Sequence, residues 1–352
     1  MAKKVKDELV EQIREVSKKK IKSDDVKIIP TGITLLDLVL GGGWPIGTIV
    51  NIVGGEGSGK TYLALETIVY ALKHVFKKGK LKFRYNDAEG GFSFDTKKMY
   101  GVEIVSDEQR PSLTVEDFGS DLQQTIDGLA EDETLIYVLD SLDGLSSEAE
   151  RNRDGERQKA FESGKEYDKG TYAMEKQKFL SQFFRLRAGE IKHKNVILII
   201  ISQVRFNITG YGEKYTRSGG KALDHSCSTI LWLYDVEKKK RKDRAIGQTV
   251  KAKTKKARIA TPFRECFLDL IFDYGVDDIN SNICFLYDLR TPQGKEGGKV
   301  KVEWDGKEYN KSKLISYIEE NNLEEVLAAR VKEKWNEIED SISSKGRKDK
   351  WK

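Results

Sequence analysis

The feature that most constrains this chain is a glycine-rich octapeptide, Gly54-Gly55-Glu56-Gly57-Ser58-Gly59-Lys60-Thr61. It matches the phosphate-loop pattern G-x-x-x-x-G-K-[ST]. Residues 48–53 before it are apolar and β-branched, which predicts a buried strand. Residues 62–73 after it carry apolar side chains at helical spacing, which predicts a helix. In this order of elements, backbone N–H groups and a helix N-terminus surround an anionic phosphate.

Two side chains complete the loop. In such loops the lysine, here Lys60, reaches the β- and γ-phosphates of a nucleotide, and the hydroxyl of Thr61 ligates Mg²⁺. The alternative is a glycine-rich turn that binds nothing. The Lys-Thr pair and the flanking strand and helix argue against that alternative, because a simple turn requires neither.

Length and composition narrow the class of protein. The 352 residues can form one large domain with small additions, or two domains. No apolar run approaches the ~20 residues that span a bilayer, and the N-terminus is charged and amphipathic, unlike a signal peptide. The cysteines Cys227, Cys266 and Cys284 are widely spaced and form no metal-ligand pair, so we expect core residues in a reducing compartment. These features predict a cytoplasmic protein without a membrane span.

Two further predicted strands end in acids. Residues 81–86 are followed by Asp87 and Glu89, and the apolar residues 134–139 are followed by Asp140. A carboxylate just beyond a strand lies on the ligand-binding edge of an open α/β sheet. Glu89 can therefore polarise a water near the γ-phosphate or cap a helix, and Asp87 is the better candidate for a cap. Asp140 has the place of a Walker B acid, which binds the Mg²⁺ of a nucleotide.

The most apolar predicted strand, residues 195–201, ends in Ser202-Gln203. A glutamine at this edge can contact a γ-phosphate and report its presence. Strands and helices alternate up to this point, and a run of strands then continues to residue 270. This order predicts a largely parallel sheet with an antiparallel extension.

Two polar segments adjoin these strands. Residues 146–170 are densely charged and read as a long mobile loop. In residues 205–221, basic side chains alternate with aromatic ones, which suits single-stranded nucleic acid because cations follow its backbone and apolar side chains meet its bases. An ordinary flexible loop is the alternative. The net charge is only +5, so the placement of the cations is more informative than their total.

The chain also divides by composition. We expect an N-terminal helix and linker in residues 1–30, which dock either on a neighbouring subunit or on their own domain. The core covers residues 31–271. A small α/β domain follows in residues 272–335, with a hairpin that turns at Asp305-Gly306 and then helices. Residues 336–352 form a charged tail that is disordered at its end.

Together the motifs resemble those of the bacterial RecA recombinase and its phage-encoded relatives, over roughly residues 5–335. The resemblance implies a RecA-like P-loop ATPase core and an ATP-dependent recombinase that uses Mg²⁺. It implies a helical filament on single-stranded DNA, homologous pairing with duplex DNA, DNA-dependent ATP hydrolysis and cooperation with a single-strand-binding protein. The matching stretches are TGITLLDLVLGGGWPIGTIVNIVGGEGSGKT, NDAEG, LIYVLDSLDGL, SQVRFNITG, SGGKAL and KKARIATPF.

The resemblance also implies roles for single residues. Glu89 becomes the catalytic glutamate, Asp140 and Ser141 the Walker B pair, and Gln203 the γ-phosphate sensor. Lys256 and Arg258 fall where the family places cations that reach a neighbour's ATP and stabilise charge at its γ-phosphate. Family DNA contacts match Lys178, Arg185, Arg205, Ile208, Gly219 and Gly220, and the composition of the same segment adds Phe206 and Arg217.

The sequence departs from the family in several places. The first loop is longer than in bacterial relatives, so its DNA residues are left open, with Met174 as a candidate wedge between bases. Ser202 replaces the usual asparagine, and residues 90–95 diverge, which leaves the adenine contacts open. The tail is basic at its end instead of acidic, and these features favour a phage origin. Two other functions stay open: an annealing or mediator protein without strand exchange, and a ring-forming ATPase.

Overall fold

The computed structural model describes residues 28–104, 111–163, 175–206, 215–297 and 301–342. The helix expected near the N-terminus, the candidates Met174 and Ile208, and the tail beyond residue 342 lie outside these ranges.

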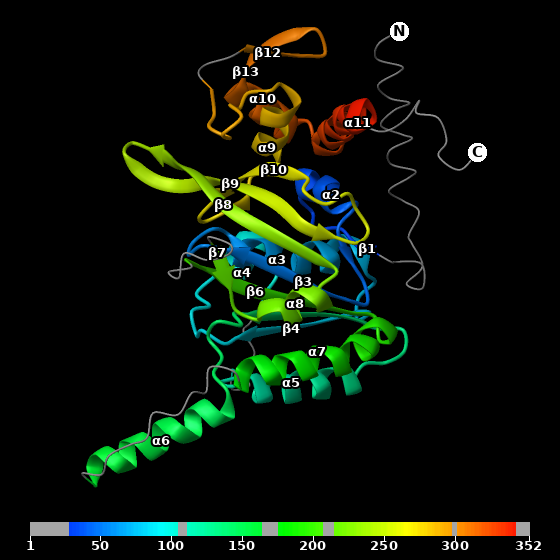
Figure 1. The fold of residues 1–352 in the computed structure, drawn as a ribbon. Coiled ribbons are helices and arrows are strands. Elements are labelled where there is room, and N and C mark those ends of the chain that lie inside the picture. The colour runs from blue at the N-terminus through cyan, green and yellow to red at the C-terminus, as the bar shows by residue number, and fades with distance from the viewer. Residues whose placement is uncertain (1–27, 105–110, 164–174, 207–214, 298–300, 343–352) are drawn as a thin grey trace.

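A nine-stranded sheet crosses the molecule in the order β11-β10-β9-β8-β3-β6-β5-β4, with β7 (Tyr215–Arg217) paired to β6 (Figure 1). The pairs from β8 through β3, β6 and β5 to the edge strand β4 are parallel, and the strands on the other side of β8 form an antiparallel extension, as the sequence predicts. The parallel strands are β3 (Thr48–Gly54), β4 (Leu81–Asp87), β5 (Thr134–Asp140), β6 (Val196–Phe206) and the start of β8 (Thr229–Arg241). The extension comprises β9 (Arg244–Ala257), β10 (Glu265–Ile271) and β11 (Gly275–Val276).

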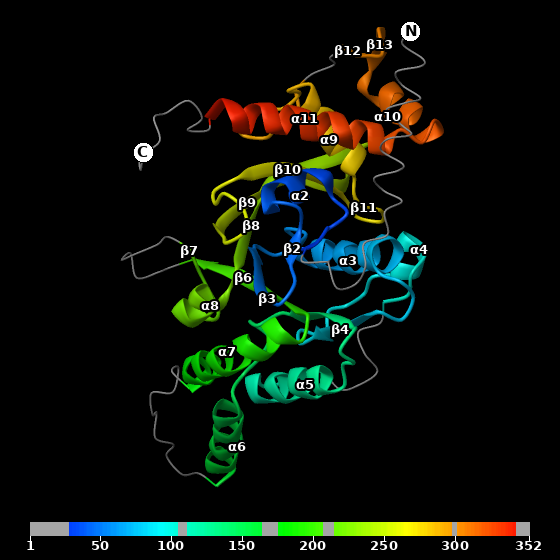
Figure 2. The ribbon, with the colours of Figure 1, turned by 90° about the vertical axis from the view of Figure 1, so that its right-hand side faces the viewer.

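The central strands are apolar because helices cover both faces of the sheet (Figures 1 and 2). On one face, α5 (Val115–Asp127), α7 (Glu175–His193) and α8 (Gly220–Ser226) bury an apolar cluster that includes Phe118 and Phe183. The opposite face carries a second cluster, and all three cysteines are buried and free. The helices of that face are α2 (Thr34–Leu40) and α3 (Lys60–Tyr70), which continues as a π-helical turn (Ala71–Val75).

The C-terminal part packs on α2 and β10 through α9 (Asp278–Leu286). Strands β12 (Lys301–Trp304) and β13 (Lys307–Asn310) form the expected hairpin, and both turn residues, Asp305 and Gly306, have positive φ. Two helices follow, α10 (Lys311–Glu320) and α11 (Glu324–Ile342), so the last helix crosses the boundary expected at residue 335. In the described ranges, no helix combines the length and the apolar character that crossing a bilayer requires.

The expectation of a loop across residues 146–170 is wrong for its first half. Helix α6 (Glu148–Glu162) occupies this part and projects from the body at the lower left of Figure 1. Ser147 and Glu150 form a reciprocal capping box at its start. Apart from Ala149, Ala160 and Phe161 the helix is polar, so no apolar periodicity marks it in the sequence, whereas the Ser-x-x-Glu signature does.

The second polar segment is also more ordered than a loop at both ends. Strand β6 continues to Phe206, and β7 pairs with it antiparallel, with Val204 opposite Arg217. Helix α8 then begins at Gly220. The two ends of this segment are therefore held side by side.

Candidate nucleotide-binding site

The glycine-rich octapeptide lies between the end of β3 and the start of α3. Gly57 and Gly59 have φ values of +68° and +90°, a region that favours glycine. A Cβ on Gly59 would lie 2.2 Å from the side chain of Leu270. The Lys60 ammonium donates to the carbonyl oxygens of Gly54 (3.2 Å) and Gly55 (2.6 Å) and so lies over the loop. The loop therefore has the conformation and the cation that phosphate binding requires.

Two oxygen ligands meet beside the loop. The Thr61 hydroxyl donates to Asp140 Oδ2 at 2.8 Å, and the Tyr85 hydroxyl donates to the same oxygen. Hydroxyl and carboxylate oxygens are the ligands that Mg²⁺ prefers. Thr61 and Asp140 therefore fit a magnesium ion bound together with a nucleotide.

Burial opposes both charges of the site. It lowers the pKa of Lys60, although Asp140, Glu89 and other nearby carboxylates favour the ammonium. Burial also raises the pKa of Asp140, against the hydrogen bonds from Tyr85 and Thr61. Both shifts favour the neutral forms, so bound phosphates and a divalent cation would stabilise the charged forms of Lys60 and Asp140.

Glu89 lies with the two other polar residues of this sheet edge. Its Oε1 accepts hydrogen bonds from the Ser141 hydroxyl and from Gln203 Nε2, the latter at 2.9 Å. The strand register explains the meeting, because Gly54 is level with Gln203, and Asp87 is level with Asp140. The arrangement leaves Glu89 oriented by two donors at the edge where the phosphate loop begins.

The expectation that Asp87 caps a helix is wrong. Its Oδ2 accepts the Phe92 backbone N–H at 2.7 Å and closes the turn after β4. The next helix, α4 (Thr96–Tyr100), is capped by Asp95, which accepts the Lys98 N–H at 2.9 Å. Glu89 caps no described helix either.

Sequence reasoning missed Asp143, which lies in the turn of residues 141–145, here named the junction turn. Asp143 Oδ2 accepts the backbone N–H of Gln203 at 2.7 Å. Its Oδ1 accepts the Ser218 hydroxyl at 2.6 Å and pairs with Arg205 at 3.1 Å. The only local signal is an acid three residues after Asp140, because its partners are about sixty or more residues away in sequence.

Lys176, in the first turn of α7, was missed for the same reason. Its ammonium donates to the carbonyl oxygens of Leu142 (2.8 Å) and Leu145 (2.6 Å), so it is bound to the same junction turn. The junction turn therefore joins the nucleotide site to the start of α7 and to both ends of the second polar segment.

Lys256 and Arg258 lie away from the phosphate loop of their own chain. Lys256 is opposite Ile230, and Ile230 is level with Asn51, three residues before Gly54. That separation is roughly 10 Å along the strands and roughly 10 Å across them. Both side chains bond to the end of α8: Lys256 donates to the carbonyl oxygen of Asp224 at 2.5 Å, and Arg258 to that of His225 at 3.1 Å.

The candidate DNA residues differ in how accessible they are. Arg205 is 62% exposed and Lys178 is 67% exposed, with Glu175 at 3.1 Å from its ammonium. Arg185 is exposed on α7. Arg217 is only 6% exposed and is paired with Asp224 at 2.5 Å. Gly219 and Gly220 have positive φ at the start of α8, and Phe206 ends β6.

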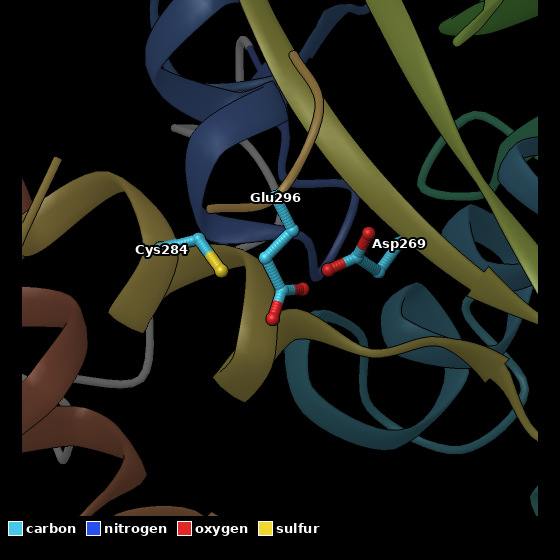
Figure 3. A group of neighbouring side chains, drawn as sticks. All are labelled: Asp269, Cys284 and Glu296. Atoms are coloured by element: carbon cyan, nitrogen blue, oxygen red, sulfur yellow. The ribbon is translucent and has the colours of Figure 1, made fainter. Parts of the chain in front are cut away.

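Ligand-type side chains also meet at Asp269, Cys284 and Glu296 (Figure 3). Asp269 is paired with Arg290 at 2.5 Å and with Lys239 at 3.1 Å. Burial raises the pKa of Cys284 to about 11, so its thiol is protonated at neutral pH. We assign this group to an internal ion-pair network, because cations already neutralise its carboxylates.

Comparison with known proteins places these residues in a wider context. The model of the RecA N-terminal domain family matches residues 10–277. Protein RecA of Nostoc sp. is 30% identical over 316 residues, which cover 88% of this chain and 81% of the relative. Protein RecA of Methylobacterium radiotolerans is 31% identical over 297 residues, which cover 83% of this chain and 73% of the relative.

Among solved structures, the crystal structure of the RadB recombinase is similar to this chain. The TM-score is 0.46 at 21% identity, and the match covers 71% of this chain and 98% of that one.

Proposed function

Because this chain belongs to the RecA family, we propose that it is an ATP-dependent recombinase. In this proposal it forms a helical filament on single-stranded DNA and pairs that strand with homologous duplex DNA. Hydrolysis of ATP depends on the bound DNA. The proposal rests on the arrangement of Gln203, whose side chain bonds to Glu89 while its backbone bonds to Asp143.

The nucleotide would bind at the sheet edge that carries the phosphate loop. Residues 54–61 would hold the phosphates of ATP, and Thr61 with Asp140 would hold Mg²⁺, which supplies charge neutralisation at the β- and γ-phosphates. Glu89 orients a water and accepts its proton, while Ser141 fixes the carboxylate by donating to Oε1. Gln203 donates to that same oxygen, so a γ-phosphate would compete with Glu89 for its amide.

Lys256 and Arg258 fit a role on a neighbouring copy. They lie too far from their own phosphate loop to reach it. Lys256 is on β9 and Arg258 directly follows β9, and both side chains donate to carbonyl oxygens near the end of α8. In a filament, each copy would present these cations to the nucleotide of the next copy and stabilise charge that develops at its γ-phosphate.

The DNA half belongs to Arg205 and its surroundings. Arg205, Lys178 and Arg185 are exposed cations that can hold phosphates, and Gly220, next to Gly219, has open space where a Cβ would lie and can admit the DNA backbone closely. Arg217 has a more limited role, because DNA would have to compete with Asp224 for it. Phe206 and Ile208 remain proposals for base contacts.

A strand-exchange assay tests this function. The protein is incubated with ATP, Mg²⁺, a circular single strand and a linear duplex, with and without a single-strand-binding protein. We expect joint molecules only with a homologous duplex, and filaments in electron micrographs of the same sample. Annealing of complementary single strands without exchange would instead support a mediator, and closed rings would support a ring ATPase.

A further inference from the structure

The carboxylate of Asp143 connects three groups that have different places in the proposed function. One oxygen holds the backbone N–H of Gln203, the residue that we propose senses the γ-phosphate. The other oxygen holds Arg205 and Ser218, which lie at the two ends of the proposed DNA-binding segment. We propose that Asp143 is a positioning residue that couples Gln203 to this segment, with single-stranded DNA competing for Arg205. This inference rests on the function proposed above.

Exposure makes the competition one-sided. The Asp143 side chain is 6% exposed, whereas Arg205 is 62% exposed. A DNA phosphate can therefore reach the guanidinium from solvent while the carboxylate stays covered. Ion pairs with one well-exposed partner are weak, so a phosphate that offers the same charge displaces the carboxylate readily.

Displacement of Arg205 changes what Asp143 does to Gln203. The carboxylate stays covered and loses its ion pair. Among the described residues the Gln203 N–H and the Ser218 hydroxyl remain as its donors, and the Lys176 ammonium is still close enough to interact with it electrostatically. A buried charge strengthens the hydrogen bonds that it keeps. DNA binding therefore holds the Gln203 backbone more firmly, at the residue whose amide side chain contacts Glu89.

The coupling must act in both directions. If the firmer hold of Asp143 on the Gln203 backbone that DNA brings favours the contact of the Gln203 amide with a γ-phosphate, then a bound γ-phosphate must weaken the hold of Asp143 on Arg205 by the same free energy. Without nucleotide, Asp143 restrains Arg205 and weakens DNA binding. With nucleotide, the restraint is relaxed and DNA binding strengthens.

The Asp143→Asn variant isolates the charge. Asparagine keeps the size of the side chain; its oxygen can accept the Gln203 N–H, and its amide can donate to the Ser218 hydroxyl. It cannot pair with Arg205. The matched control is Asp224→Asn, which removes the partner of Arg217 at the other end of the segment but has no described contact with Gln203.

The measurement is the affinity for a fluorescent oligo-dT strand, without nucleotide and with a non-hydrolysable ATP analogue and Mg²⁺. For the wild type, we expect tighter binding with the analogue. Asp143→Asn should bind the strand about threefold to tenfold more tightly without nucleotide, because Arg205 no longer has to leave the carboxylate, and its salt slope should stay like that of the wild type, since Arg205 neutralises a phosphate in both complexes. The effect of the analogue should shrink at least threefold, whereas Asp224→Asn should change both affinities by the same factor.

An Asp143→Asn variant that binds DNA no more tightly without nucleotide, or responds to the analogue like the wild type, overturns the coupling role. Should this variant unfold, Arg205→Ala breaks the same ion pair from the other partner, and a response to the analogue that stays like that of the wild type overturns the role equally. The wild type separates the two levels of the account. A wild type with no response to the analogue contradicts the proposed function itself, and the coupling role with it.

Discussion

The two segments that lead toward the proposed DNA face are both bound to the junction turn, residues 141–145, but by different chemistry. Helix α7, which follows the first segment in sequence, is held by Lys176 in its first turn, whose ammonium donates to two backbone carbonyl oxygens. The second is held by the carboxylate of Asp143, which pairs with the exposed Arg205. Lys176 is partly buried, whereas the Arg205 side chain is 62% exposed, so a DNA phosphate reaches Arg205 more easily from solvent and can replace its carboxylate partner. The difference suggests a fixed support on one side and an exchangeable contact on the other.

The nucleotide site that both segments share can be removed first. Lys60→Ala should lower the rate of ATP hydrolysis by about 10²–10³, because a preorganised cation at the phosphates is lost. The contacts of Lys176 with the junction turn and the Asp143–Arg205 pair should both survive, since neither involves Lys60. Steady-state hydrolysis measures the loss, and oligo-dT binding without nucleotide should stay within about twofold of the wild type. A variant that hydrolyses ATP at the normal rate would show that the octapeptide is not the site.

The fixed support can be broken alone. Lys176→Met keeps an apolar stem but leaves the carbonyl oxygens of Leu142 and Leu145 without their donor, which should cost about 2 kcal/mol of folding stability. Denaturant unfolding measures this cost. The response of DNA affinity to an ATP analogue should persist, because Asp143 and Gln203 remain in place. A folded variant that loses this response would mean that Lys176 as well as Asp143 couples the nucleotide to DNA binding.

The exchangeable contact can be broken from the DNA side. Arg205→Ala should weaken binding of single-stranded DNA about tenfold, because one charge-assisted contact to a phosphate is lost. Its salt slope should fall by about one. Nucleotide affinity should not change. Lys178→Ala is the matched control for the other segment, an equally exposed lysine beside Glu175, and we expect at most about a threefold effect from it. Equal effects of the two variants would remove the distinction between the segments.

The smallest effect is the change of folding stability with pH, which should leave the contacts of Lys176 and Asp143 unchanged. Burial raises the pKa of Asp37 to about 7 from 3.8, and that of Glu66 to about 7 from 4.5. The folded state therefore holds these protons at higher pH than the unfolded chain does. Their contribution to stability is complete below about pH 4 and is lost as the pH rises to about 7.

Asp37→Asn tests this sign, because asparagine keeps an oxygen that can accept from Thr31 but does not titrate. Its thermal midpoint should fall less than that of the wild type between pH 5 and pH 8, by a few degrees. A steeper fall in the variant would reverse the sign. The response of DNA affinity to the ATP analogue should be the same in both proteins, since Asp37 lies apart from the junction turn.

The parts of the molecule that the sequence predicted well are those with local signals. Strands β3, β5 and β6 are apolar and lie side by side in parallel. The phosphate loop, Asp140 and Gln203 are therefore close to one another at one edge of the sheet, as the sequence predicts. Helix α6 lacked an apolar periodicity, and its one local signal, the Ser-x-x-Glu capping box at its start, was not used.

Asp143 and Lys176 were missed for a different reason. Their roles depend on where the chain returns after many residues, which neither spacing nor composition encodes. The contacts of Asp143 can be recognised only in the fold, where β6 and β7 bring Arg205 and Ser218 to the junction turn. The same limit applies to Arg217, which composition marked as a DNA contact and the fold buries against Asp224.

The central claim is that the nucleotide site and the DNA-binding segment work as one unit. The most direct test is the rate of ATP hydrolysis by the full-length protein as single-stranded DNA is added at constant ATP and Mg²⁺. The account predicts a rate that is low without DNA, rises with added strand and saturates when the strand covers the protein. A substantial rate that is the same with and without DNA would contradict it.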